Sequence, residues 1–535
     1  MNRGAILDIP GLIARWSRWG SRPALTFYRG RTRDGRLSYG DLVARVEQLA
    51  GALYRDFGVR RGDRVAVLSP NRLEVPVLVL ALLRLGAVVV PLNPGAAPED
   101  WAYALCHSEA CGLLATRDLA ARVGGAARPQ FTLNVEDAFA AGAPAPPAER
   151  GLNEQVAVVL YTSGTTGIPK GVALRQRNVL SNAWSMASSF RLDGTTQLAV
   201  LPLYHAHAFG FGLMTALSTA GHLVFTERLE PFTYGDVVRA ESVEVSSVVP
   251  TLLPTLLAAG VTRQTAPSLR HLLVSSAPLP GDVARDFETH GRIPLVHGWG
   301  LSEYTNFACC VSPDLPPDER ARLMFSAEVP SIGPALEGTE VRVVDERGRH
   351  VEEGTSGELV VRGHSTMAGY FRDAESTART LDSDGWLRTG DEGRFRMHAG
   401  RPIYFVTGRL KELIIRDAEK YSPLGLERRL VAALPELSGR VVVVGFPHRV
   451  HGEEVGAYVE IDGLREELRA RLTAAIQAIP MAERPKVILH GTRPIPRTHT
   501  GKIQRRKMQP WFSAFASQRG PVVISEVAVE EPVSW

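Results

Sequence analysis

Lysine and cysteine are scarce in this chain. Only six of the 535 residues are lysines: Lys170, Lys411, Lys420, Lys486, Lys502 and Lys507. A lysine that falls inside a motif is therefore harder to explain as an accident of composition. The four cysteines are Cys106, Cys111, Cys309 and Cys310. They form no CxxC pair and no Cys/His spacing typical of zinc binding, so no zinc site is expected, and free thiols fit a reducing cytoplasm.

Long apolar runs are also missing. The first twenty residues lack the apolar centre of a signal peptide. The most apolar stretch, residues 75–92, is interrupted by Arg84 and Gly86. A buried helix that leads into a strand is expected there instead of a membrane span. These absences predict a cytoplasmic protein with no transmembrane segment.

Charge of one sign is not concentrated either. The formal net charge is +4, and the basic residues, mostly Arg, are scattered along the chain. Scattered Arg is typical of solvated surfaces, so no nucleic-acid partner is expected. A hydrophobic content of 44% and a charged content of 22% are ordinary for a globular protein. The length predicts about two to four folding units.

What the sequence does contain is a regular alternation of Val/Leu-rich runs and helix-length segments. Strands are expected at residues 63–70, 87–92, 156–163, 221–226, 245–250 and 271–276, and helices at 74–85, 179–190 and 281–290. Continuous apolar strands between helices predict a parallel, two-sided α/β sheet. From about residue 338 the pattern favours the hairpins of a β subdomain, and beyond residues 408–411 a smaller α+β unit. Residues 312–330 are expected to form a surface loop.

The strongest local motif is YTSGTTGIPKGV at residues 161–172. Gly permits tight turns and close backbone approach, while hydroxyls and backbone N–H groups can surround phosphate oxygens. Lys170 adds a positive charge. The GxxxxGK[ST] pattern of a Walker loop is absent. The alternative, a flexible Gly/Ser turn, is less consistent with Pro169 and Lys170 in place.

This motif resembles the phosphate-binding loop of the adenylate-forming superfamily, which contains acyl-CoA synthetases, acyl-AMP ligases, nonribosomal-peptide adenylation domains and firefly-type luciferases. Further motifs follow in the family's order, and they extend the resemblance from about residue 19 to residue 507. The resemblance implies ATP as a substrate and assigns a nucleotide-binding role to the loop, with Thr162 also catalytic. The loop residues are Thr162, Ser163, Gly164, Thr165, Thr166, Gly167 and Lys170.

Three motifs resemble segments around the nucleotide and the acyl group. LPLYHAHAFG (201–210) implies that His205 borders the acyl pocket, although a structural role for this His is an open alternative; His207 is expected to be structural. SSAPL (275–279) resembles the turn against adenine, formed by Ser276, Ala277 and Pro278, with Ser276 in place of a commoner Gly or Ala. HGWGLSE (297–303) contributes His297, Gly298, Trp299, Ser302 and Glu303, with Trp299 in place of the usual Tyr. By resemblance, Trp299 flanks adenine, Ser302 contacts the α-phosphate and Glu303 binds Mg²⁺.

The remaining motifs resemble the ribose site and the mobile domain. Asp391, in GWLRTGD, is expected to accept the ribose hydroxyls, and Arg409, in TGRLKE, to contact ribose and phosphate. Lys411 matches the hinge, and Lys502, in PRTHTGKIQR, matches the lysine that is essential for adenylation. The resemblance implies a large N-terminal AMP-binding domain (1–408) of two α/β subdomains and a β subdomain. It also implies a hinge (409–411), a small mobile α+β C-terminal domain (412–510) and a tail (511–535) without an assigned role.

The implied reaction is ATP-dependent activation of a small-molecule carboxylic acid as acyl-AMP, with release of pyrophosphate, followed by transfer to a thiol. Residues 202–210 offer no carboxylate for an α-ammonium group. An aliphatic or aryl acid is therefore favoured over an α-amino acid. Coenzyme A is the favoured acceptor. However, LIIRDAEKYSP (413–423) has Ala418 where coenzyme A ligases usually have Gly.

Alternatives to coenzyme A ligation therefore stay open. One is an acyl-AMP ligase that loads the phosphopantetheine of an acyl carrier protein, or an amine. Luciferase-like oxygenation is another, and a non-catalytic nucleotide-binding protein is a third. The joint presence of Lys170, Glu303, Asp391, Arg409 and Lys502 argues against the last.

Overall fold

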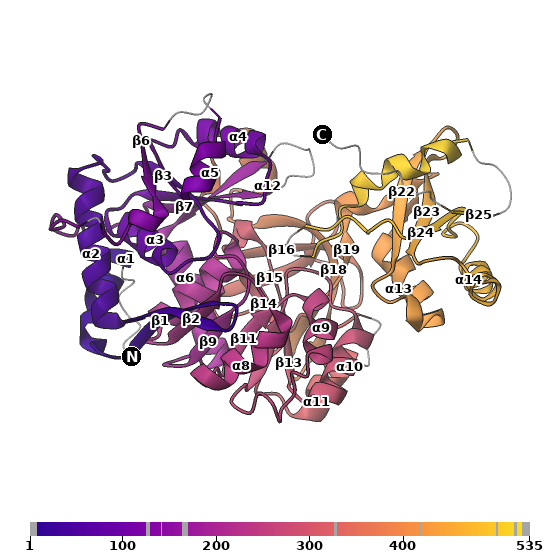
Figure 1. The fold of residues 1–535 in the computed structure, drawn as a ribbon. Helices are drawn as coiled ribbons and strands as arrows, with labels where there is room; N and C mark the ends of the chain where they lie inside the picture. The colour runs from indigo at the N-terminus through magenta and orange to yellow at the C-terminus, as the bar shows by residue number, and fades with distance from the viewer. Residues whose placement is uncertain are drawn as a thin grey trace.

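The computed structural model describes residues 8–124, 129–140, 142–162, 169–325, 329–417, 419–498, 501–517 and 522–526. Figure 1 shows a large N-terminal part, and a smaller C-terminal part that carries β22–β24, α13 and α14 at one end of the molecule. The helices are α1 Ile9–Trp16, α2 Tyr39–Arg55, α3 Glu74–Arg84, α4 Pro98–Ser108, α5 Arg117–Arg122, α6 Gln176–Phe190, α7 Ala216–Ser218, α8 Pro231–Glu241, α9 Leu253–Ala258, α10 Gly281–Gly291, α11 Pro317–Phe325, α12 Ala374–Thr380, α13 Pro423–Ala433 and α14 Glu466–Ala478.

Two large sheets form the N-terminal part. The eight-stranded sheet has the order β14-β13-β12-β11-β9-β10-β1-β2. Its strands are β1 Pro23–Arg29, β2 Thr32–Ser38, β9 Thr196–Ala199, β10 His222–Thr226, β11 Val245–Val248, β12 His271–Val274, β13 Leu295–Gly300 and β14 Phe307–Cys310. The seven-stranded sheet has the order β17-β8-β7-β4-β3-β5-β6. Its strands are β3 Arg64–Leu68, β4 Val88–Leu92, β5 Gly112–Ala115, β6 Phe131–Asn134, β7 Val156–Thr162, β8 Lys170–Arg175 and β17 Gly369–Tyr370.

Helices packed between these sheets share one hydrophobic core with both of them. Leu42 and Val46 of α2, Leu78 of α3 and Val179 of α6 are fully buried in the same cluster as residues from β1, β4, β7 and β10. On α2, Leu42, Val46 and Leu49 recur every three to four residues and form one apolar face, whereas α3 is buried along its whole length from Val75 to Arg84. Burial on both faces also explains why the strands are continuous Val/Leu runs.

Two smaller sheets complete the fold. The antiparallel sheet β15-β16-β18-β19 is made of β15 Thr339–Val344, β16 Gly357–Gly363, β18 Leu387–His398 and β19 Arg401–Arg409. The last sheet has the order β21-β20-β23-β24-β25, with β22 also paired to β23. Its strands are β20 Ile414–Arg416, β21 Glu419–Tyr421, β22 Val441–His448, β23 Gly452–Glu460, β24 Val487–Gly491 and β25 Val523–Glu526.

The predicted α/β fold with several sheets is confirmed, but two local expectations were wrong. The large sheets are parallel only in part, because β8 runs antiparallel to β7, as β2 does to β1 and β14 to β13. The connections are too short for the crossover that parallel neighbours require. The loop expected at residues 312–330 contains helix α11, which buries Leu323 and Met324. Within the described ranges, no helix is both long enough and apolar enough to cross a bilayer.

Candidate active site

The candidate site is built at strand ends where the N-terminal sheets meet the sheet β15-β16-β18-β19. The hairpin β7–β8 pairs Thr162 with Lys170 at the end where the two strands are connected. Ser163, Gly164, Thr165, Thr166 and Gly167, which connect the two strands, lie outside the described residues. The predicted phosphate loop therefore starts and ends at adjacent positions of a hairpin.

Lys170 belongs to a chain of contacts that ends at Glu303. Its Nζ donates to Ser376 Oγ at 2.6 Å and lies 4.9 Å from the centroid of the Tyr370 ring. Tyr370 reaches this position because β17 pairs with β8, with Tyr370 opposite Val172. The Tyr370 hydroxyl donates to Glu303 Oε1 at 3.0 Å. Burial first, and then the Glu303 carboxylate, raise the pKa of Tyr370, so the hydroxyl keeps its proton and remains a donor.

Glu303 lies in a 3₁₀ turn, Ser302–Tyr304, just after β13. Its backbone carbonyl accepts from the Met367 amide at 2.9 Å, which fixes the turn against the segment before β17. No three His, Cys, Asp or Glu side chains gather into a metal-binding group in the part of the chain that the structure describes. A single carboxylate fits Mg²⁺, which takes its other ligands from phosphate oxygens and water.

Asp391 is clamped between two sheets. Arg409 Nε lies 3.0 Å from Asp391 Oδ1, because the register of β18 and β19 places the two residues opposite each other. Trp299 Nε1, from the end of β13, donates to Asp391 Oδ2 at 2.9 Å. The Asp391 carboxylate raises the pKa of Arg409, and burial of the guanidinium opposes that rise. Asp391 is only 4% exposed, so the ion pair and the hydrogen bond replace contacts with water that burial removes.

The predicted adenine turn follows β12. Ser276 has a φ of +73°, which is unusual for a residue with a Cβ. His207 Nδ1 lies 2.8 Å from Ser276 Oγ and 3.1 Å from Ser275 Oγ, and its Nε2 contacts Ser247 Oγ on β11. Burial, with a smaller effect of His205, lowers the pKa of His207 to about 3, so the ring is neutral. His207 thus links the turn to the sheet.

Ala277 and Pro278 continue the same turn, and Pro278 is exposed to solvent.

His205 begins a turn that leads into a buried π-helix, Ala208–Thr215. Its backbone carbonyl accepts from the Phe209 amide at 3.0 Å, and its ring centroid lies 4.4 Å from that of Tyr204. The π-helix is entirely apolar apart from Thr215, and its two glycines approach other elements closely. A Cβ at Gly210 would lie 2.8 Å from Asn306 Nδ2.

His297 and Gly298 have packing and hydrogen-bonding roles in β13. His297 Nδ1 lies 2.9 Å from the Ser331 carbonyl. Because a carbonyl can only accept, Nδ1 carries the proton. Burial lowers the pKa of His297 to about 4. A Cβ at Gly298 would lie 2.3 Å from the Phe307 ring, so the close pairing of β13 and β14 requires glycine there.

Lys502 joins the site from the C-terminal part. Its side chain remains in contact with solvent, yet the protein that surrounds it lowers its pKa, and Arg409 lowers it further. Asp391 and Glu303 act in the opposite direction. The neighbouring Gly501 has a φ of +80°, and a Cβ there would lie 3.2 Å from Thr251 Oγ1. The Lys502 loop therefore approaches the N-terminal part closely.

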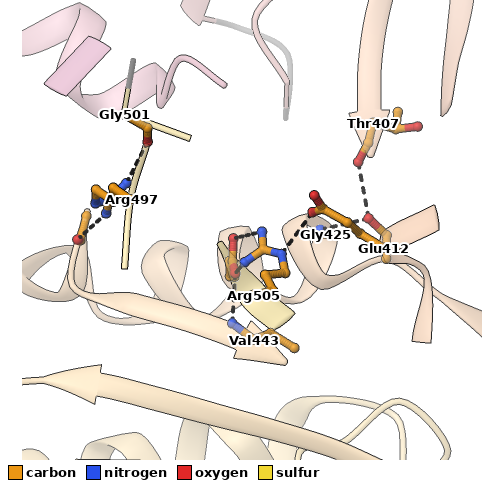
Figure 2. A network of polar contacts seen from close by, with 10 residues as sticks. Thr407, Glu412, Gly425, Val443, Arg497, Gly501 and Arg505 are labelled. Carbon is orange, nitrogen blue, oxygen red and sulfur yellow. Dashed lines mark hydrogen bonds and ion pairs between the residues drawn. The ribbon is translucent and has the colours of Figure 1, made fainter. Parts of the chain in front are cut away.

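A second polar network holds this loop in the C-terminal part, as Figure 2 shows. Arg505 donates to both oxygens of Glu427, at 2.7 and 3.2 Å, and through Nε to Glu412 at 3.1 Å. Glu427 also accepts from the Val443 amide at 2.7 Å. Arg497 donates to the carbonyls of Gly501 and Gly439 at 3.2 and 3.1 Å. The loop is thus tied to α13, β22 and the segment just after Arg409.

The structure brings together Glu303, Asp391, Arg409, Trp299 and Lys502, although they are up to 203 residues apart. Lys411 lies exposed in the short turn Leu410–Glu412, between the last two sheets. Ala418, on which the acceptor question depends, lies outside the described residues.

Sequence reasoning missed Tyr370, Ser376 and Glu427. None of them belongs to a motif that predicts chemistry, and their partners are 67 to 206 residues away. Arg505 was inside a quoted motif but had no assigned role. Only the pairing of β17 with β8, and of α13 with the Lys502 loop, shows these contacts.

The chain is similar to known proteins over most of its length. Residues 13–371 match the family model described as AMP-binding enzyme. The chain is 32% identical over 487 residues to a feruloyl-CoA synthase from Amycolatopsis sp., covering 89% of this chain and 94% of that protein. It is 30% identical over 488 residues to a sulfoacetate–CoA ligase from Cupriavidus necator, covering 88% of this chain and 92% of that protein. The solved structure of ATP-bound MatB from Rhodopseudomonas palustris has a TM-score of 0.83 and 26% identity, over 95% of this chain and 100% of that one.

Proposed function

Since the chain belongs to the AMP-binding enzyme family, we propose that Glu303, Asp391, Arg409 and Lys502 form the site at which a carboxylic acid is activated. The protein is an ATP-dependent, AMP-forming acid–thiol ligase. A carboxylate oxygen attacks the α-phosphorus of ATP and pyrophosphate leaves. The thiol of coenzyme A then attacks the carbonyl carbon of acyl-AMP, and AMP leaves.

One observation supports the site most strongly. Lys502 comes from a separate sheet and a distant part of the sequence, yet its charge interacts with those of Arg409, Asp391 and Glu303. A lysine with a lowered pKa, beside a carboxylate held by one ion pair and one hydrogen bond, is typical of a site that binds anions. A purely structural surface lysine would not need Gly501 at a φ of +80° to approach the N-terminal part.

In the first half-reaction, Lys502 offsets the negative charge that develops between the carboxylate and the α-phosphate. Lys170 exchanges Ser376 for a phosphate oxygen at the other end of the nucleotide, and Ser302 contacts the α-phosphate. Asp391 and Arg409 hold the ribose. Glu303, oriented by Tyr370, provides the protein ligand for Mg²⁺, which when bound neutralises phosphate charge.

In the second half-reaction, the C-terminal domain (residues 412–510) turns about the hinge at 409–411. Lys502 leaves the acyl-phosphate and opens the path for the thiol. The Arg505 network moves with this domain, because Glu412, Glu427 and Arg505 all lie beyond Lys411. The loop therefore moves as one unit with α13 and β22.

The acid is an aliphatic or aryl carboxylic acid without an α-ammonium group. The segment that leads from His205 into the π-helix contains no carboxylate and is almost entirely apolar. A buried ammonium group would need a charged partner. The related feruloyl-CoA synthase and sulfoacetate–CoA ligase have names that also refer to acids without an α-amino group.

Two assays test this function. ATP–pyrophosphate exchange with a panel of aryl, short-chain, long-chain and amino acids should reveal exchange with at least one acid without an amino group. Exchange with α-amino acids alone would overturn the acid class, and exchange with none would overturn the activity. Thioester formation should then be observed with free coenzyme A. If only a phosphopantetheine-loaded acyl carrier protein accepts the acyl group, the carrier protein is the acceptor instead.

A further inference from the structure

The Asp391 carboxylate accepts a hydrogen bond from an indole. The Trp299 N–H donates to Asp391 Oδ2 at 2.9 Å. Trp299 is 8% exposed and Asp391 is 4% exposed, so the bond is shielded from water. A hydrogen bond from a buried donor to a carboxylate is among the stronger ones in proteins.

The two partners of Asp391 lie at different oxygens, one in an ion pair and the other in a hydrogen bond. Arg409 Nε lies 3.0 Å from Oδ1, and Trp299 Nε1 holds Oδ2. Each carboxylate oxygen has about two acceptor positions, of which the Trp299 N–H takes one on Oδ2 and the Arg409 ion pair lies at one on Oδ1. One acceptor position therefore remains on each oxygen. Two adjacent acceptors held in a fixed plane match the two hydroxyl donors of a vicinal diol.

The clamp also comes from two separate structural units. Arg409 is fixed by the β18–β19 register, whereas Trp299 is on β13 of the eight-stranded sheet. With Arg409 alone, the carboxylate could rotate about its bond to Cβ, since only one oxygen would be held. The bond from Trp299 removes that rotation.

We propose that Trp299 is a positioning residue that fixes the Asp391 carboxylate for recognition of the ribose diol, and that it thereby sets the preference for ribonucleotides. This inference rests on the proposed nucleotide site. It predicts that the Trp299 N–H strengthens the part of nucleotide binding that comes from the ribose hydroxyls. A residue that only forms a wall of the pocket would affect all adenine nucleotides equally.

The test is equilibrium binding of AMP, 2′-deoxy-AMP and 3′-deoxy-AMP by calorimetry to the wild type and to Trp299→Phe. The wild type should prefer AMP by about tenfold or more, the value expected for a hydrogen bond to a charged group. Trp299→Phe should reduce that preference at least about threefold. The preference is a ratio of affinities for the same folded protein, so a partly unfolded variant does not change it.

Trp101→Phe is the matched control. Trp101 is also buried, at 1% exposure, and its Nε1 donates to the Asn93 carbonyl at 2.7 Å, but it lies in α4. This variant should keep the wild-type preference. In an Asp391→Asn background, where the carboxylate is already absent, Trp299→Phe should cause no further loss of preference.

Two results would overturn the inference while leaving the proposed function intact. One is a Trp299→Phe variant that weakens all three nucleotides by the same factor or not at all. The other is a full additional loss of preference in the Asp391→Asn background. Failure of the wild type to bind AMP would instead contradict the proposed function itself.

Discussion

Removal of the Arg505 side chain should cause a large loss of stability that depends on pH, because Arg505 forms ion pairs with Glu412 and Glu427. Arg505 and Glu427 are each about one-tenth exposed, with side-chain values of 11% and 9%. Arg505→Ala leaves the Glu427 carboxylate buried with the Val443 amide as its remaining donor among the contacts described above. Breaking a buried pair by removal of one partner costs about 3–5 kcal/mol. The backbone amides around α13 and β22 should therefore lose most of their protection from hydrogen exchange.

The sign of the pH dependence follows from the pKa of Glu427. Burial raises that pKa, and Arg505 opposes the rise. Without Arg505, the pKa of Glu427 in the folded protein rises further above its value in the unfolded chain. A proton bound more tightly in the folded state favours folding as the pH falls. The deficit of Arg505→Ala should therefore shrink between about pH 8 and about pH 5.

The assay is hydrogen exchange of the β22 amides, read by mass spectrometry, since a chain of several domains does not unfold in one step. Arg505→Ala should lower their protection by about a hundredfold or more, because each factor of ten corresponds to about 1.4 kcal/mol. Arg506→Ala is the matched control, because Arg506 is adjacent but exposed. It should change stability by less than about 0.5 kcal/mol. Equal effects of both variants, or a deficit that grows as the pH falls, would refute the reasoning.

Three further substitutions test the site. Lys502→Ala should slow adenylation about 10²–10³-fold but change thioester formation from supplied acyl-AMP only a few-fold; equal loss in both half-reactions would show that Lys502 is misassigned. Tyr370→Phe removes the donor to Glu303 and should raise the Mg²⁺ concentration for half-maximal pyrophosphate exchange about tenfold, whereas an unchanged Mg²⁺ titration would exclude this positioning role. Gly300→Ala would place a Cβ 1.7 Å from the Asn306 carbonyl oxygen and should cost about 3 kcal/mol or more in unfolding free energy. Gly124→Ala, where a Cβ has open space, should be neutral, and equal melting temperatures for these two variants would contradict the packing argument.

Local signals in the sequence predicted much of the fold. The helix expected at residues 74–85 is α3, and the strand expected at 87–92 is β4, because Arg84 and Gly86 separate a helix-length apolar run from a strand-length one. The helix expected at 179–190 begins earlier, at Gln176, where Asn178 bonds back to the Arg175 amide. The sequence does not reveal this start, because Arg is not a residue type that predicts a helix cap.

Contacts between distant segments were harder to foresee. The Ala- and Pro-rich segment at residues 142–148 packs closely on α2, since a Cβ at Gly51 would lie 1.9 Å from the Ala143 carbonyl oxygen. Asp391 was assigned to the ribose from its motif, but its bond to Trp299 depends on how two sheets meet. Chemistry carried by one segment can be read from the sequence, whereas a partner 92 residues away cannot.

The most direct test of adenylation follows one oxygen atom. An acid that supports pyrophosphate exchange is labelled with ¹⁸O in both carboxylate oxygens and supplied with ATP and coenzyme A. If the carboxylate attacks the α-phosphorus and the thiol then attacks the carbonyl carbon, mass spectrometry should find one ¹⁸O in AMP and one in the acyl thioester. Formation of ADP with ¹⁸O in inorganic phosphate, or of thioester with unlabelled AMP, would contradict an acyl-AMP intermediate.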